Sequence, residues 1–193
     1  MLIVISNNKG GQGKTFLATL LTLFLASNPD NEDRITCCDL DRSQRNFSDS
    51  VSKLKLPIIH NLPDKKEYNR RFWIVDTPPN IREVTDVVRQ AIIDADLLVV
   101  PVILSKYSVQ GVNRVAETRG AKDLRIILND WNGTLIEKKA EEYLHNEGFD
   151  IIGKLSRNRR VSRNIESLDR WDAGLQRAQA QKIISVLAGI FKS

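Results

Sequence analysis

A turn near the amino terminus has the sequence Lys9-Gly10-Gly11-Gln12-Gly13-Lys14-Thr15. The apolar run at residues 2–5 precedes it and a longer apolar segment at residues 16–25 follows it, which predicts a strand, a glycine-rich turn and a helix. Such a turn directs consecutive backbone N–H groups and the positive end of the helix at one point, which suits a polyphosphate. Lys14 is then placed to reach the β- and γ-phosphates, and the Thr15 hydroxyl to hold a Mg²⁺ that bridges them.

This loop departs from the usual P-loop pattern, because Asn8 stands where that pattern has its first glycine and a second lysine, Lys9, precedes the double glycine. The string from Lys9 to Thr15 resembles the deviant P-loop of the ParA/MinD family of ATPases, in which the early lysine is the signature residue. The resemblance implies that residues 9–16 bind ATP between two subunits, and that Lys9 of each subunit reaches the phosphates of the other. Phe16 stands where the family usually has a second threonine, so the contact of that hydroxyl with the α-phosphate must be lost or supplied elsewhere.

Two acidic motifs follow predicted strands, at the edge of the sheet where α/β folds bind ligands. The first, Asp39-Leu40-Asp41-Arg42-Ser43-Gln44, is similar to the family's Asp-x-Asp-Pro-Gln segment, with Arg42-Ser43 where the family has one proline. By this resemblance Asp41 is the first candidate to activate the attacking water and Asp39 the second, and hydrolysis is expected to be slow and stimulated by a partner. The second motif, Asp76-Thr77-Pro78-Pro79, resembles the family's Asp-x-Pro-Pro segment, in which Asp76 would hold Mg²⁺ through water.

Two further positions carry the resemblance toward the middle of the chain. Ser105-Lys106-Tyr107-Ser108-Val109-Gln110-Gly111 looks like the family segment that leads into the helix at the dimer face, although alone it would be a helix start capped by Ser108. Asn129 occupies the family's base-reading position, where its amide can pair with an adenine edge, or it is simply a turn former at the end of a strand. The lysine of the guanine-reading Asn/Thr-Lys-x-Asp motif is missing, which favours ATP over GTP.

Short apolar runs alternate with longer amphipathic segments along the 193 residues. This pattern is typical of the α/β class, and here it predicts a single P-loop NTPase domain with a mostly parallel β-sheet flanked by helices on both faces. We expect strands at residues 2–6, 34–38, 72–76, 97–102, 124–128 and 149–152, and helices at residues 14–26, 81–94, 109–118, 134–146 and 173–191. The polar stretch at residues 46–71 gives no clear pattern.

The net charge of +5 is concentrated toward the carboxyl end. Residues 151–193 carry nine basic and three acidic side chains, a net charge of +6, so the first 150 residues sum to −1. Four arginines lie within seven residues and resemble the basic region that meets DNA in short ParA-type proteins: Arg157, Arg159, Arg160 and Arg163. Their phosphate contacts would give salt-sensitive, nonspecific DNA binding, whereas the alternative is a solvated charged face.

The final predicted helix has an apolar face and sparse lysines, so we expect it to dock on the sheet, although in a MinD-like protein the terminal helix inserts into lipid. No apolar stretch approaches a membrane span, and Met1 leads directly into a strand. A cytoplasmic protein is therefore expected. The resemblance to ParA-type proteins further implies that it associates with the nucleoid. Cys37 and Cys38 are adjacent, so they cannot form a disulfide framework, and they most simply pack in a buried strand.

Together the resemblances imply a small ParA-type partition ATPase with ATP and Mg²⁺ as cofactors. An ATP-bound homodimer would hold nonspecific DNA and position or segregate plasmid DNA, and a ParB-like or other centromere-binding partner would stimulate hydrolysis and dissolve the dimer. Two alternatives stay open. One is a MinD-like positioning ATPase that acts at the membrane, or a relative that positions a protein complex. The other is a nucleotide-dependent plasmid stability or conjugation factor that does not hydrolyse ATP.

Overall fold

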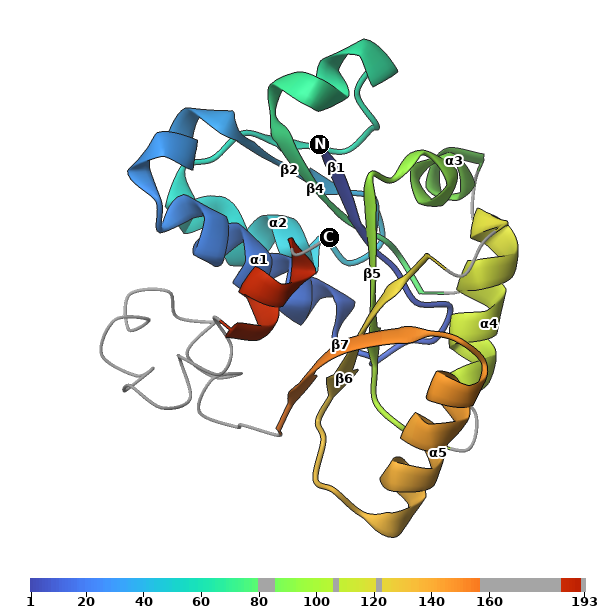
Figure 1. The fold of residues 1–193 in the computed structure, drawn as a ribbon. Helices are drawn as coiled ribbons and strands as arrows, with labels where there is room; N and C mark the ends of the chain where they lie inside the picture. Colours follow the sequence, from blue (N-terminus) through green and yellow to red (C-terminus); the bar gives the residue numbers. More distant parts are fainter. Residues whose placement is uncertain (80–85, 106–107, 121–122, 157–184, 192–193) are drawn as a thin grey trace.

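The computed structural model describes residues 1–79, 86–105, 108–120, 123–156 and 185–191. Seven parallel strands form one sheet in the order β3-β2-β4-β1-β5-β6-β7 (Figure 1). The strands are β1 (Leu2–Ile5), β2 (Ile35–Asp39), β3 (Ile58–Ile59), β4 (Phe72–Asp76), β5 (Leu97–Val102), β6 (Arg125–Asn129) and β7 (Asp150–Leu155). Because β1 is the central strand, the glycine-rich turn that follows it leaves the sheet at its middle.

Helices cover both faces of the sheet (Figure 1). One face carries α1 (Lys14–Ala26), α2 (Asn46–Val51) and a helix at residues 185–190, and the other carries α3 (Asp86–Asp94), α4 (Ser108–Arg119) and α5 (Leu135–Asn146). Three short 3-10 helices are η1 (Pro29–Arg34), η2 (Ser52–Leu54) and η3 (Lys65–Arg70).

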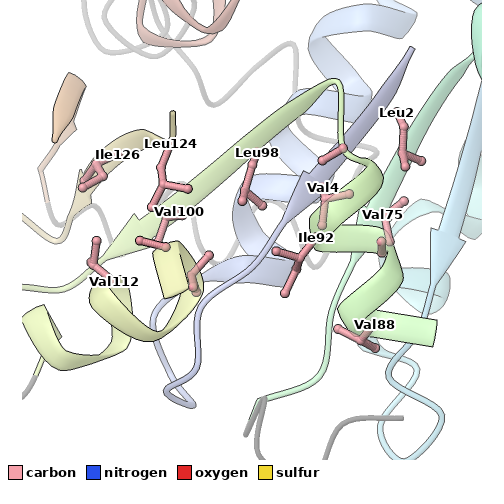
Figure 2. Packing of buried hydrophobic residues seen from close by; sticks show 14 of the residues in the cluster. Leu2, Val4, Val75, Val88, Ile92, Leu98, Val100, Val112, Leu124 and Ile126 are labelled. Carbon is pink, nitrogen blue, oxygen red and sulfur yellow. The ribbon is translucent and has the colours of Figure 1, made fainter. Parts of the chain in front are cut away.

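Strand residues alternate between two apolar cores. In β1, Ile3 and Ile5 join the core beneath α1, whereas Leu2 and Val4 join the core beneath α3 and α4 (Figure 2). A strand covered on both faces must be apolar at every position, which is why these strands appear as continuous apolar runs in the sequence. The expected α/β class is confirmed.

The expected elements differ from the observed ones mainly at their ends. α1 has the expected bounds, but β2 and β6 each lie one residue later, so Asp39 and Asn129 are the last residues of their strands. α5 begins one residue later than expected because Thr134 is its N-cap. The Thr134 hydroxyl accepts a hydrogen bond from the Glu137 backbone N–H, and the Glu137 carboxylate accepts one from the Thr134 backbone N–H.

Residues 46–71, which showed no pattern, contain α2, η2, β3 and η3. β3 is a two-residue strand at the edge of the sheet, too short to produce a period of two in the sequence. α2 has only six residues and is fixed by Phe47 and Val51, both fully buried in the core that α1 also covers.

The described part of the last helix, residues 185–190, docks on the sheet as expected. Val186, Leu187 and Ile190 are buried in the core beneath α1, and the Phe191 ring stacks on Phe24 with centroids 6.4 Å apart. Gly153 in β7 permits this approach, because a Cβ there would lie 2.7 Å from both Val186 methyl groups. The earlier residues of the expected helix lie outside the described ranges. Among the residues that the structure describes, no helix is long and apolar enough to span a membrane.

The adjacent cysteines of β2 are packing residues, as expected. Both are fully buried, Cys37 in the core beneath α1 and Cys38 in the opposite core. Burial raises the pKa of each thiol to about 12, so both remain protonated and unreactive at neutral pH.

Candidate nucleotide-binding site

The glycine-rich turn has the backbone of a phosphate-binding loop. Gly11 has φ 71° and Gly13 has φ 87°, and Gly13 is also the N-cap of α1. A side chain at either position would be strained, and a Cβ on Gly13 would lie 2.2 Å from the Asn129 amide nitrogen. The turn therefore brings the start of α1 to the centre of the carboxyl edge of the sheet, where its free N–H groups suit an anion.

The two lysines of the turn lie in different surroundings. Lys14 is only 7% exposed, and its Nζ is 3.4 Å from the Lys9 carbonyl oxygen, so it lies under the loop. Burial lowers the pKa of Lys14, while the charges of Asp76 and Asp41 oppose that shift. Lys9 is exposed, and its Nζ lies 3.3 Å from Ser105 Oγ in the segment that follows β5. Lys14 therefore faces into the loop and Lys9 faces across its rim.

Thr15 and Asp76, the two residues that the sequence predicts to hold Mg²⁺, are in direct contact. The Thr15 hydroxyl donates a 2.6 Å hydrogen bond to Asp76 Oδ2. The second oxygen, Oδ1, is buried and has no hydrogen-bond partner within the described chain. A hydroxyl and a carboxylate with a spare oxygen, beside the lysine of a phosphate loop, fit Mg²⁺ and its water ligands.

We expect the affinity for Mg²⁺ in the presence of saturating nucleotide to fall as the pH is lowered from about 8 to about 6. Desolvation raises the pKa of Asp76 to about 7, although the hydrogen bond from Thr15 opposes this. Because metal binding requires the carboxylate, affinity should fall by up to about tenfold per pH unit below 7. Magnesium titrations followed with a fluorescent nucleotide test this, and Asp76→Asn, which has no proton to lose there, gives the background from phosphate titration.

The raised pKa of Asp76 also affects the stability of the nucleotide-free protein, which is expected to fall as the pH rises. Since the folded state binds the Asp76 proton more tightly than the unfolded state, this group lowers the free energy of unfolding as the pH rises from about 4 through 7. If magnesium affinity changes between about pH 8 and pH 6 by the same factor in the wild type and in Asp76→Asn, the assignment of Asp76 to the magnesium site is contradicted.

Asp39 and Asp41 differ in how their carboxylates are used. Asp39 is fully buried, and its Oδ2 accepts hydrogen bonds from the N–H and hydroxyl of Ser48. Asp41 is half-buried, and its Oδ1 accepts hydrogen bonds from Ser43 and Gln44 in its own turn. Within the described ranges Asp41 Oδ2 accepts no hydrogen bond, so one of its oxygens is free to meet a water molecule.

Two polar residues, Asn7 and Gln12, fix the loop through contacts that its sequence did not predict. The Asn7 side chain donates to Pro101 O at 2.8 Å and accepts from the Lys9 backbone N–H. The Gln12 side chain, 4% exposed, accepts from the Ile103 N–H at 2.9 Å. Both therefore tie the turn to the end of β5. The only feature of the sequence that could have indicated the contact of Asn7 is its position as a polar residue after an apolar strand. No feature of the sequence indicated the contact of Gln12 with Ile103.

The Asn129 amide nitrogen donates to Gln12 O at 3.2 Å, so this side chain borders the turn. Its position beside the loop is compatible with base reading, which stays a prediction. Ser108 is the first residue of α4, and its hydroxyl donates to Ile103 O, so the alternative interpretation of Ser108 as the residue that precedes and caps this helix does not fit the structure.

Phe16 and the arginine cluster complete the expected site residues. The Phe16 side chain packs against the core beneath α1, which leaves its backbone N–H as the group that it can offer to a phosphate. Arg157, Arg159, Arg160 and Arg163 lie outside the described residues.

The sequence matches the family described as the CobQ/CobB/MinD/ParA nucleotide binding domain over residues 3–170. No match is found among curated protein sequences. A similar solved structure is that of a putative plasmid partition protein from Borrelia burgdorferi B31 bound to AMPPNP, at 16% identity and a TM-score of 0.73, covering 97% of this chain and 96% of that chain. The MinD cell division protein of Aquifex aeolicus is 18% identical with a TM-score of 0.70, covering 96% of this chain and 94% of that chain.

The septum site-determining protein MinD of Pyrococcus horikoshii, complexed with Mg-ADP, is 15% identical with a TM-score of 0.70, covering 98% of this chain and 95% of that chain. At these identities the structures show a shared fold, and the family match covers most of the sequence. The chain therefore belongs to the CobQ/CobB/MinD/ParA family of nucleotide-binding domains, which confirms the resemblance that its P-loop and acidic motifs predicted.

Proposed function

We propose that this chain is a ParA-type ATPase that binds Mg²⁺–ATP, dimerises around it, holds DNA without sequence preference and positions plasmid DNA with a ParB-like or other stimulating partner. The observation that carries the proposal is that the two lysines of the loop differ in their exposure and in the groups that they contact. Lys14 is buried under the turn, and Lys9 is exposed and directed toward Ser105.

An exposed Lys9 supports a role across a dimer. Its Nζ contacts the segment after β5 and not the interior of its own loop, so its charge is available to a molecule that faces the rim. A second copy docked by this edge would present its own nucleotide to that charge, and a cation supplied from outside stabilises phosphoryl transfer. The two bound nucleotides would then join the two subunits.

Within each subunit the remaining groups have separate tasks. Lys14 and the start of α1 would hold the phosphates, and Thr15 with Asp76 would hold Mg²⁺, which supplies positive charge to offset that of the phosphates. Asp41, with its free oxygen, orients the attacking water and accepts its proton. The inserted Arg42-Ser43 lengthens this loop, which supports slow hydrolysis in the absence of a partner.

DNA binding is proposed from charge alone. The basic carboxyl-terminal residues contrast with a near-neutral body, and an ATP dimer would present two such regions side by side.

We expect a native gel to show retardation of DNA of arbitrary sequence with ATP but not with ADP, and this retardation should be weaker at the higher of two salt concentrations. Lys14→Ala should abolish it. Replacing Arg159 and Arg160 by alanine should weaken it, whereas replacing the exposed Lys138 and Lys139 should not. Equal retardation in all nucleotide states would contradict the switch.

A MinD-like membrane role is the second candidate, because MinD structures share the fold. The docked helix at residues 185–190 argues against it, since its apolar face is already covered. Co-sedimentation with ATP, using liposomes of anionic lipid in one arm and DNA in the other, separates the two roles. Binding to liposomes alone would favour the membrane role.

A further inference from the structure

The carboxylate of Asp39 connects both ends of the segment that contains Asp41. Its Oδ1 accepts a 3.0 Å hydrogen bond from the Asp41 backbone N–H. Its Oδ2 accepts two more, from the Ser48 backbone N–H at 2.9 Å and from the Ser48 hydroxyl at 2.8 Å. Asp39 is fully buried, so these three donors take the place of water around its charge.

Ser48 belongs to an element that is firmly packed. It lies in α2, directly after the fully buried Phe47, and Val51 anchors the other end of this helix in the same core. Asp39 is equally fixed, because β2 pairs with β4 on one side and with β3 on the other. The hydrogen bonds between Ser48 and Asp39 therefore join two rigid parts of the fold.

The residues between these two anchors are exposed. Arg42, Ser43, Gln44 and Arg45 all face solvent, and Arg45 has φ 50°, an uncommon value for a residue other than glycine. Hydrogen bonds from Ser43 and Gln44 to Asp41 hold the loop internally, and fixed ends are needed in addition to place it relative to the sheet. The Asp41 N–H bonded to Asp39 is one such end, and Ser48 is the other.

We propose that Ser48 is a positioning residue, which acts through Asp39 to fix the backbone at Asp41 and so places the water-activating carboxylate. Asp39 is then the connection between Ser48 and Asp41, and Asp41 alone meets the reacting water. This inference rests on the proposed ATPase function. It deepens that proposal by adding Ser48, which the sequence did not single out, and by giving Asp39 a positioning task.

The test compares Ser48→Ala, Ser48→Thr and Ser50→Ala in the full chain. Ser50 is the matched control, since it lies in the same helix and its hydroxyl donates only to Asn46 O at 2.7 Å within that helix. We expect Ser48→Ala to lower kcat about tenfold, because a misplaced catalytic group loses rate steeply with small displacements. The Kd for a fluorescent ATP analogue should change less than about twofold, since the phosphate loop is untouched. Ser48→Thr, which keeps the hydroxyl, should recover most of the rate, and Ser50→Ala should match the wild type.

A second measurement reports the loop without relying on hydrolysis. Trypsin cleaves after Arg42 and Arg45, and mass spectrometry separates these cuts from those elsewhere. We expect trypsin to cut Ser48→Ala at these two sites several-fold faster than the wild type or Ser50→Ala. The Tm of the three proteins should be equal, which would show that the faster cleavage is a local effect. Cleavage rates that do not differ, or loss of kcat and nucleotide affinity in equal proportion, would overturn the positioning role. A wild-type chain that binds the nucleotide without hydrolysing it would contradict the ATPase proposal itself, while the cleavage rates would still decide whether Ser48 orders the loop.

Discussion

Lys14→Ala is expected to weaken ATP binding by at least about 100-fold. Lys14 is 7% exposed beneath the turn, where its ammonium is expected to pair with the phosphates. Removing one partner of a buried charge pair costs about 3–5 kcal/mol, which corresponds to a factor of 100 or more in Kd. Titration with a fluorescent ATP analogue in excess Mg²⁺ measures this loss directly.

The fold of Lys14→Ala should remain intact. Burial lowers the pKa of Lys14 in the nucleotide-free protein, which means that its charge is a cost there. We therefore expect the Tm of the nucleotide-free variant to equal or exceed that of the wild type. Lys139→Ala, at an exposed position in α5, serves as the control and should bind ATP normally. Wild-type affinity in Lys14→Ala would place the phosphates elsewhere.

Asp41→Asn is expected to lower ATP turnover by at least about 100-fold while nucleotide binding persists. The amide keeps the size and hydrogen-bonding pattern of the loop, but it cannot accept a proton from water. Since charge repulsion between the carboxylate and the γ-phosphate is also relieved, ATP affinity should be equal or higher. Steady-state phosphate release and the fluorescent-nucleotide titration together separate these two effects.

This variant also tests the dimer. With hydrolysis blocked, Asp41→Asn should remain dimeric in ATP and Mg²⁺ during size-exclusion chromatography with light scattering, and it should become monomeric in ADP. Asp49→Asn provides the control, because Asp49 is exposed in α2, a few residues along the chain. Equal turnover in the wild type and Asp41→Asn, near background, would favour the alternative of a binding module that does not hydrolyse ATP. A monomer in every nucleotide state would remove the dimer proposal.

Much of the fold could be predicted because its information is local. Continuous apolar runs in the sequence indicate strands that are buried on both faces. The closely spaced glycines indicate the turn before α1, where Gly11 and Gly13 have positive φ. The identity of the phosphate loop and the placement of Asp76 at a strand end follow from motifs of a few adjacent residues. The two-residue β3 and the six-residue α2 escaped prediction because neither is long enough to produce a period.

The local sequence determined the class of fold and the glycine-rich turn that leads into α1, since each depends on neighbours along the chain. The surroundings of the polar side chains around that turn were decided by contacts between distant residues, such as Thr15 with Asp76, 61 residues apart, and Gln12 with Ile103, 91 residues apart. Asp39 shows the difference best. Its motif made it a catalytic candidate, but the folded chain surrounds it with three donors, and buried carboxylates are stable only when such donors converge from separate segments. That convergence depends on how strands and helices pack, and no local pattern records it.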